Sequence, residues 1–161
     1  MVAGCRRKRL LWLLFVAYCL MLLWLLFFGR IGDGQATGQI NLCPLQTVKR
    51  YLWVLRHSTE PGMRSNAVAN LLGNVALFVP LGLFLPWQSS YLRCFWRFLL
   101  IVGLVILDVE LAQAATGLGT FDVDDLLLNL LGAALGYVVC RLVQKYHHRG
   151  GASCPESNLN I

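Results

Sequence analysis

The chain has 161 residues, of which 57% are hydrophobic and only 14% are charged, and its mean hydropathy is +0.61. Soluble domains carry about 25% charged side chains, so this composition excludes an ordinary water-soluble domain. The formal net charge of +6 does not indicate a nucleic-acid partner, because the basic residues lie at the ends of apolar runs without any nucleic-acid-binding motif. The composition therefore predicts an integral membrane protein whose surrounding partner is the lipid bilayer.

Four apolar segments approach the roughly 20 residues that a helix needs to cross the hydrocarbon layer. They cover residues 10–28, 67–85, 98–115 and 126–143. The first follows a basic run, but it is too long for a signal peptide and no clean cleavage site follows, so we expect it to remain as a span. The sequence predicts an all-α fold, a polytopic membrane helix bundle with four transmembrane helices.

The domain organisation follows from these spans. We expect a basic cytoplasmic N-terminus over residues 1–9, a membrane domain over 10–145 and a flexible cytoplasmic tail over 146–161. Lys and Arg near span ends are retained in the cytoplasm, and they gather at both termini and in the turn between the second and third spans. The last connection, 117–125, has neither residue and is expected outside. The first connection carries basic residues although this topology places it outside, and longer connections follow the rule less strictly.

The first connection divides into two parts. Residues 29–38 are rich in glycine and predict a flexible coil, whereas residues 45–57 predict a short amphipathic helix that lies in the membrane interface. Val48, Leu52 and Leu55 share one face of that helix. The six cysteines form no Cys-x-x-Cys pair and the histidines lack ligand spacing, so we expect no metal site and no cofactor.

Polar side chains recur at one end of the spans, where burial in hydrocarbon makes each of them a functional hypothesis. Asn70 and Asn74 lie four residues apart near the outer end of the second span. Glu110 and Gln113 lie three apart at the end of the third, which runs the opposite way. Each pair therefore shares a helix face at the outer boundary.

The fourth span begins with an acidic run that contains Asp122, Asp124 and Asp125. Asp125 starts a stripe with spacings of four, three and four residues, formed by Asp125, Asn129, Gly132 and Gly136. Its upper part is polar, and its lower part is a Gly-x-x-x-Gly pattern at which another helix backbone can approach closely.

These residues predict a ligand-binding or functional cluster near the outer interface, formed by Asn70, Asn74, Glu110, Gln113, Asp122, Asp124, Asp125 and Asn129. A purely structural interpretation competes with it. Asp122 is placed to cap the fourth helix, and Asn74 and Asn129 are suited to hydrogen bonds between helices. Asp108 points to a different face from Glu110 and is left out of the cluster. The predicted kink and packing positions are Gly73, Pro80, Gly82, Gly132 and Gly136.

A family resemblance rests on several motifs in order. The stretches 70–74 (NLLGN) and 78–82 (FVPLG) look like the first signature of VanZ-like membrane proteins. The stretches 110–113 (ELAQ), 121–125 (FDVDD) and 129–132 (NLLG) resemble the rest of that pattern, and Asn41 with Pro44 resembles the short Asn-x-x-Pro element before it. Many members carry an arginine shortly before the acidic run, whereas residues 118–120 (LGT) provide none, which puts ligand preference or activity in doubt if relatives bind an anion there.

The resemblance implies a multi-pass protein of the bacterial cytoplasmic membrane, in a family whose founding member is linked to teicoplanin resistance. We expect a cell-envelope factor that binds or handles a lipid-linked or lipid-like molecule at the outer leaflet, and that affects glycopeptide susceptibility. One alternative is a small metal-assisted intramembrane hydrolase or transferase, in which the acidic residues hold a divalent cation. Another is a structural assembly factor. The sequence specifies no oligomeric state.

Overall fold

The computed structural model describes residues 2–28, 40–117 and 120–150, and the fold of this part is helical. The elements in chain order are α1 (Val2–Phe28), β1 (Ile40–Asn41), α2 (Gln46–His57), α3 (Pro61–Gln88), the 3-10 turn η1 (Tyr91–Arg93), α4 (Phe95–Thr116), β2 (Phe121–Asp122) and α5 (Val123–Gly150). The predicted all-α class is confirmed, and the short amphipathic helix is present as α2. The coil predicted over 29–38 lies outside the described residues.

Four of the helices are long and apolar enough to cross a membrane. The apolar stretches are Arg9–Phe27, Pro61–Gln88, Phe95–Thr116 and Val123–Tyr146. The prediction of four spans is therefore confirmed, although α3 and α5 extend beyond the predicted span ends. In particular, α5 continues to Gly150, into the segment predicted as a tail, and residues 151–161 of that tail lie outside the described part.

Helices α3 and α5 pack backbone against backbone. A Cβ atom added to Gly132 would lie 2.0 Å from the Val75 carbonyl oxygen, and one added to Gly136 would lie 2.1 Å from that of Val79. From the other side, a Cβ on Gly82 would lie 2.0 Å from the Ala133 carbonyl oxygen. Small residues permit such approach in membrane bundles, where the hydrophobic effect does not drive helices together. Gly73 differs from these three, because a Cβ there would meet nothing within 4 Å.

Two prolines lie inside α3, and neither ends it. Pro86 is buried within α3, which runs on to Gln88. A proline removes one intrahelical hydrogen bond, and membrane helices tolerate this because neighbouring groups satisfy the backbone. In the turn before Pro80, the Tyr18 hydroxyl of α1 donates to the Leu77 carbonyl, which ties α1 to α3.

The core joins all four long helices around α4. Phe98, Val102 and Ile106 of α4 are at most 2% exposed. Around them pack residues from the other three long helices, namely Leu22, Leu26, Phe78, Ala133 and Tyr137. The Tyr137 hydroxyl donates to the Arg93 carbonyl, which ties α5 to the turn between α3 and α4.

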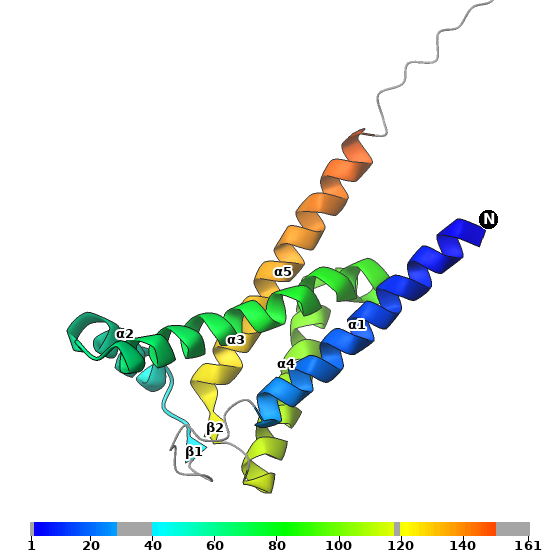
Figure 1. Cartoon of the computed structure of the whole chain (residues 1–161). Coiled ribbons are helices and arrows are strands. Elements are labelled where there is room, and N and C mark those ends of the chain that lie inside the picture. The colour runs from blue at the N-terminus through cyan, green and yellow to red at the C-terminus, as the bar shows by residue number, and fades with distance from the viewer. Residues whose placement is uncertain (1, 29–39, 118–119, 151–161) are drawn as a thin grey trace, which may run out of the picture.

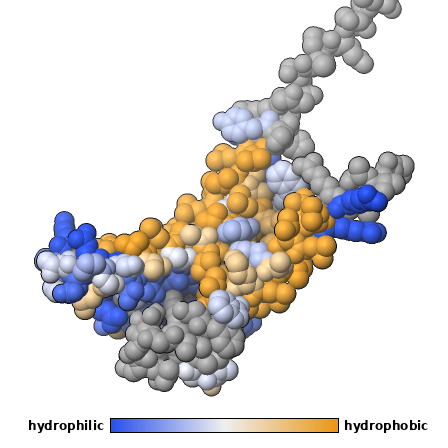
Figure 2. Space-filling view, in the orientation of Figure 1, coloured by the Kyte–Doolittle hydropathy of each residue, from blue (hydrophilic) through white to orange (hydrophobic). Residues whose placement is uncertain are grey.

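The bundle has two distinct ends. The N-terminal end of α1 and the C-terminal end of α5 lie toward the same side, away from β1, β2 and α2 (Figure 1). A hydrophobic surface covers the middle of the long helices, whereas hydrophilic surface gathers around α2 and at the start of α1 (Figure 2). The apolar surface is thus placed for lipid contact, and the end of the bundle that carries α2 has hydrophilic surface.

Candidate functional site

The site is assembled where the chain enters α2 and α5. Strands β1 and β2 pair in parallel, with Ile40 opposite Phe121 and Asn41 opposite Asp122. This short pairing joins the long first connection to the start of the fourth span. It brings side chains that are about 80 positions apart in sequence into hydrogen-bonding contact.

Asp122 is the centre of this contact. Its Oδ1 accepts from Asn41 Nδ2 at 3.2 Å and from the Asp124 amide at 2.9 Å, and its Oδ2 accepts from the Thr47 hydroxyl at 2.6 Å. Asn41 Nδ2 also lies 3.0 Å from Thr47 Oγ1. The bond to the Asp124 amide caps α5, which confirms the capping role predicted for Asp122. Asp122 therefore both starts α5 and fixes the connection that leads to α2.

Asp124 caps a different helix. Its Oδ1 accepts from the Leu45 amide and its Oδ2 from the Val48 amide at 3.0 Å, so one carboxylate satisfies two free donors at the start of α2. Leu45 adopts a left-handed conformation with φ of 65°. Asp124 is fully buried, and a negative charge at a helix N-terminus is stabilised by the helix dipole. Its position thus defines it as a structural residue that holds α2.

Asp125 faces α3. Asn74 Nδ2 donates to Asp125 Oδ1 at 2.6 Å, and both residues are buried. Asn129 and Glu110, each 2% exposed, are buried in the same bundle. Gln113 is directed to another neighbour, because its Nε2 donates to the Leu26 carbonyl of α1 at 2.6 Å. Among the described residues, the Asn129 Oδ1 and Gln113 Oε1 atoms are buried without a hydrogen-bond partner.

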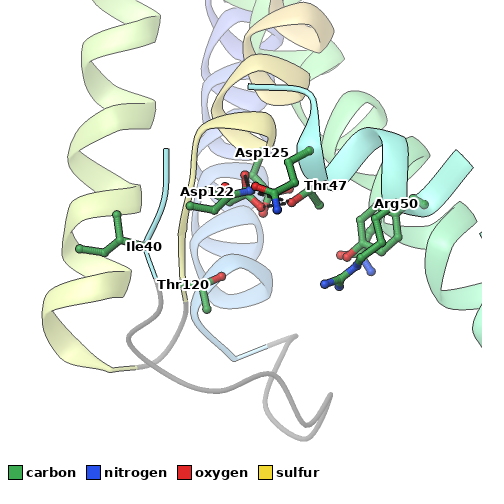
Figure 3. Close-up of a pocket in the computed structure, with 10 residues that line it drawn as sticks. Ile40, Thr47, Arg50, Thr120, Asp122 and Asp125 are labelled. Atoms are coloured by element: carbon green, nitrogen blue, oxygen red, sulfur yellow. Dashed lines mark hydrogen bonds between the residues drawn. The ribbon is translucent and has the colours of Figure 1, made fainter. Parts of the chain in front are cut away.

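A pocket of about 300 Å³ opens beside Asp122 and Asp125. It is lined by residues of β1, α2, α3 and the start of α5, namely Ile40, Asn41, Gln46, Thr47, Arg50, Tyr51, Asn70, Thr120, Asp122 and Asp125. Figure 3 shows Asp122, Asp125 and Thr47 close together, with Arg50 apart from them on α2. The volume is at the lower end of the range for small-molecule sites. The pocket therefore presents charges of both signs to a small polar group.

The structure sorts the predicted cluster into three groups. Asn70, Asp122 and Asp125 line the pocket. Asn74 and Asp124 do not line the pocket but hold residues around it. Asn74 donates to Asp125, and Asp124 accepts from the start of α2. Glu110, Gln113 and Asn129 are buried in the bundle and are not among the lining residues. Asn70 also donates to the Asn66 carbonyl at 2.9 Å, within its own helix.

Several lining residues were missed from the sequence. Asn41 was quoted only for the family motif, while Thr47 and Arg50 belong to a helix interpreted as lying in the interface. Little in the sequence indicated their role, because the spacing of residues in a short helix does not show which distant segments their side chains contact. On α2 the buried residue is Tyr51, whereas Leu52, expected on the same face as Val48, is 53% exposed.

Hydrogen-bond donors already surround the carboxylates of the site. Across residues 2–28, 40–117 and 120–150, no group of three or more His, Cys, Asp and Glu side chains is placed to hold a metal ion. The physical reason is visible at Asp124, whose two oxygens both accept backbone amides of α2. The arrangement is suited to hydrogen bonding and to charge recognition.

The hydroxyl of Thr47 provides a direct test of this network. We expect Thr47→Val to lower stability by about 1–2 kcal/mol, because the isosteric side chain leaves Asp122 Oδ2 without its donor. Thr47→Ser, which keeps the hydroxyl, should remain close to the parent protein. Thermal unfolding followed by circular dichroism in detergent compares the three proteins. Equal midpoints for the valine and serine variants would show that the hydroxyl does not hold the site.

The fold and the pocket together define a class, a multi-pass membrane protein with a polar pocket at one end of four apolar helices. The model of the VanZ/LLP1 family matches residues 15–144. This match spans most of the chain, and the protein belongs to the VanZ/LLP1 family. No curated protein and no solved structure matches the chain.

Proposed function

We propose that the protein binds the polar head of a lipid-linked or lipid-like molecule at the outer leaflet of the bacterial cytoplasmic membrane. The observation that carries the proposal is the polar pocket of about 300 Å³ at one end of apolar helices. A molecule with a polar head and an apolar chain matches both surfaces, because the head fills the pocket while the chain stays in lipid. The outward direction of this end rests on the distribution of Lys and Arg.

Ile40 supports the amphiphilic character of the ligand. It lines the pocket and is nevertheless 67% exposed, so it forms an apolar edge beside the charged side chains. Leu42, the next apolar residue, is 65% exposed. A lipid whose head enters the pocket would place its first chain carbons against this edge, where burial of apolar surface stabilises binding.

The family resemblance extends the proposal to envelope physiology, with altered teicoplanin susceptibility as the expected phenotype. Binding is preferred to metal-assisted hydrolysis, because both oxygens of Asp124 already accept backbone amides of α2 and Asp122 already accepts from Asn41, Thr47 and the Asp124 amide. Turnover of a lipid-linked substrate by the purified protein would reverse this preference.

Isogenic bacterial strains test the function. We expect deletion of the gene to change teicoplanin susceptibility and envelope-precursor composition, and the parent gene to restore both. Asp125→Asn should fold, because the amide oxygen can still accept from Asn74, yet it should fail to restore the phenotype. Asp108→Asn is the matched control, since Asp108 is exposed on α4 and lies outside the pocket.

Restoration by Asp125→Asn at parent level would contradict a role for the pocket charge. The same membrane abundance must be shown for both variants by immunoblot. An absence of any difference between deletion and parent strains across a panel of envelope antibiotics would contradict the proposed function as a whole.

A further inference from the structure

We propose that the pocket selects a zwitterionic headgroup, with an anionic phosphate beside Arg50 and a primary ammonium beside Asp122 and Asp125. This inference rests on the proposed function, and it names the class of lipid that the site takes. Phosphatidylethanolamine is the simplest membrane lipid of this class. The inference is carried by opposite charges that line one small pocket from two different elements.

Arg50 forms the cationic side. It lies on the second turn of α2, lines the pocket, and is exposed. In the part of the chain that the structure describes, its guanidinium forms no ion pair and stands over the Tyr51 ring at 5.7 Å from the ring centroid. A guanidinium presents several donors in a planar fork that suits phosphate oxygens. Arg50 is therefore placed to receive an anionic group of the ligand.

Asp122 and Asp125 form the anionic side. Asp122 is 8% exposed and Asp125 is 6% exposed, yet both line the pocket. Their positions are fixed by hydrogen bonds from Thr47 to Asp122 and from Asn74 to Asp125, so the negative charge is preorganised. Figure 3 shows the two carboxylates close to Thr47, with Arg50 apart from them on α2. Preorganised carboxylates in a partly closed pocket favour a cationic group with N–H donors.

The size of the pocket limits the rest of the ligand. A volume of about 300 Å³ accommodates a small headgroup, whereas a head made of several sugars and a peptide would need much more space. Four further lining side chains are neutral polar or aromatic groups that suit a headgroup of mixed charge, namely Gln46, Tyr51, Asn70 and Thr120.

Short-chain lipids test the inference on the full-length protein in detergent. The probes are dihexanoyl phosphatidylethanolamine, dihexanoyl phosphatidylglycerol, hexylamine and chain-free glycerophosphoethanolamine, and the readout is binding by native mass spectrometry with a titration series. We expect the phosphatidylethanolamine to bind at least about tenfold more tightly than the phosphatidylglycerol, since one charge-assisted contact is lost in the latter. The chain-free headgroup should bind more weakly than the lipid that carries chains.

Two variants separate the charges. Arg50→Gln should weaken both phospholipids about tenfold or more and leave hexylamine unchanged. Asp125→Asn should weaken the phosphatidylethanolamine and hexylamine while leaving the phosphatidylglycerol unchanged. Arg56→Gln is the matched control for Arg50, because Arg56 is exposed on the same helix and does not line the pocket.

The outcomes distinguish this inference from the proposed function. If the two phospholipids bind equally and Asp125→Asn changes the binding of neither, the proposed selection of a zwitterionic headgroup would be overturned. The pocket would then bind lipids with anionic heads. Equal effects of Arg50→Gln and Arg56→Gln would overturn the assigned phosphate position. Equal binding of phosphatidylethanolamine and the chain-free headgroup would overturn the claim that the ligand is amphiphilic. Binding of none of the probes would overturn both proposals.

Discussion

Gly132→Ala should destabilise the folded protein by about 3 kcal/mol or more, although it adds a single methyl group. The new Cβ would lie 2.0 Å from the Val75 carbonyl oxygen, and that atom belongs to the backbone of α3. A flexible side chain could move away, but here two helices must separate, which exceeds the usual cost of about 1–3 kcal/mol for an overpacked core. Thermal unfolding and size-exclusion profiles in detergent measure the effect.

The matched control is Gly73→Ala in α3. A Cβ at Gly73 meets nothing within 4 Å, so the substitution adds only the helix preference of alanine, about 0.5–1 kcal/mol of added stability. The same substitution is thus expected to lower stability at Gly132 and to raise it at Gly73. A Gly132→Ala protein as stable as the parent would contradict the close approach of α3 and α5.

Asp124→Ala should release α2 from the bundle while the long helices stay folded. The variant removes the carboxylate that accepts from the Leu45 and Val48 amides, and it leaves both donors without their acceptor. The loss of two charge-assisted bonds in a fully buried position costs about 3–5 kcal/mol, which is large for a helix of 12 residues. Hydrogen exchange followed by mass spectrometry should show faster exchange over residues 45–57 than in the parent.

Asp108→Asn is the control here as well, because this residue is exposed and caps no helix terminus in the described structure. Exchange that stays slow over residues 45–57 in Asp124→Ala would contradict the capping role. Faster exchange throughout α3 and α5 would contradict the expectation that the effect is local.

The membrane architecture was predictable because each span is a continuous apolar segment of the sequence that is long enough to cross the membrane. The stripe on α5 was visible for the same reason, since Asn129, Gly132 and Gly136 recur at helical spacing and all three are buried. The capping of α5 by Asp122 followed from its position just before the span. These features depend on residues that are neighbours in sequence.

The pocket was less predictable because it depends on contacts between distant segments. Nothing in the local sequence pairs Asn41 with Asp122, and the pairing follows from two strands of two residues each. Asp124 was placed in a ligand cluster because an acidic residue at a span end looks the same whether it meets a ligand or backbone amides. Likewise, the helical spacing of Gln113 and Glu110 did not indicate that Gln113 donates to α1.

The central claim is that the pocket formed by α2, α3 and α5 opens on the outer side of the membrane. Two native cysteines test it, because Cys43 lies beside the pocket, Cys94 lies at the start of α4 toward the other end, and both are exposed. Each is kept as the single cysteine of a variant and treated in intact cells with a membrane-impermeant maleimide. The account predicts that Cys43 is labelled in intact cells and Cys94 only after permeabilisation. Labelling of Cys94 but not Cys43 in intact cells would contradict it, because the pocket would then face the cytoplasm.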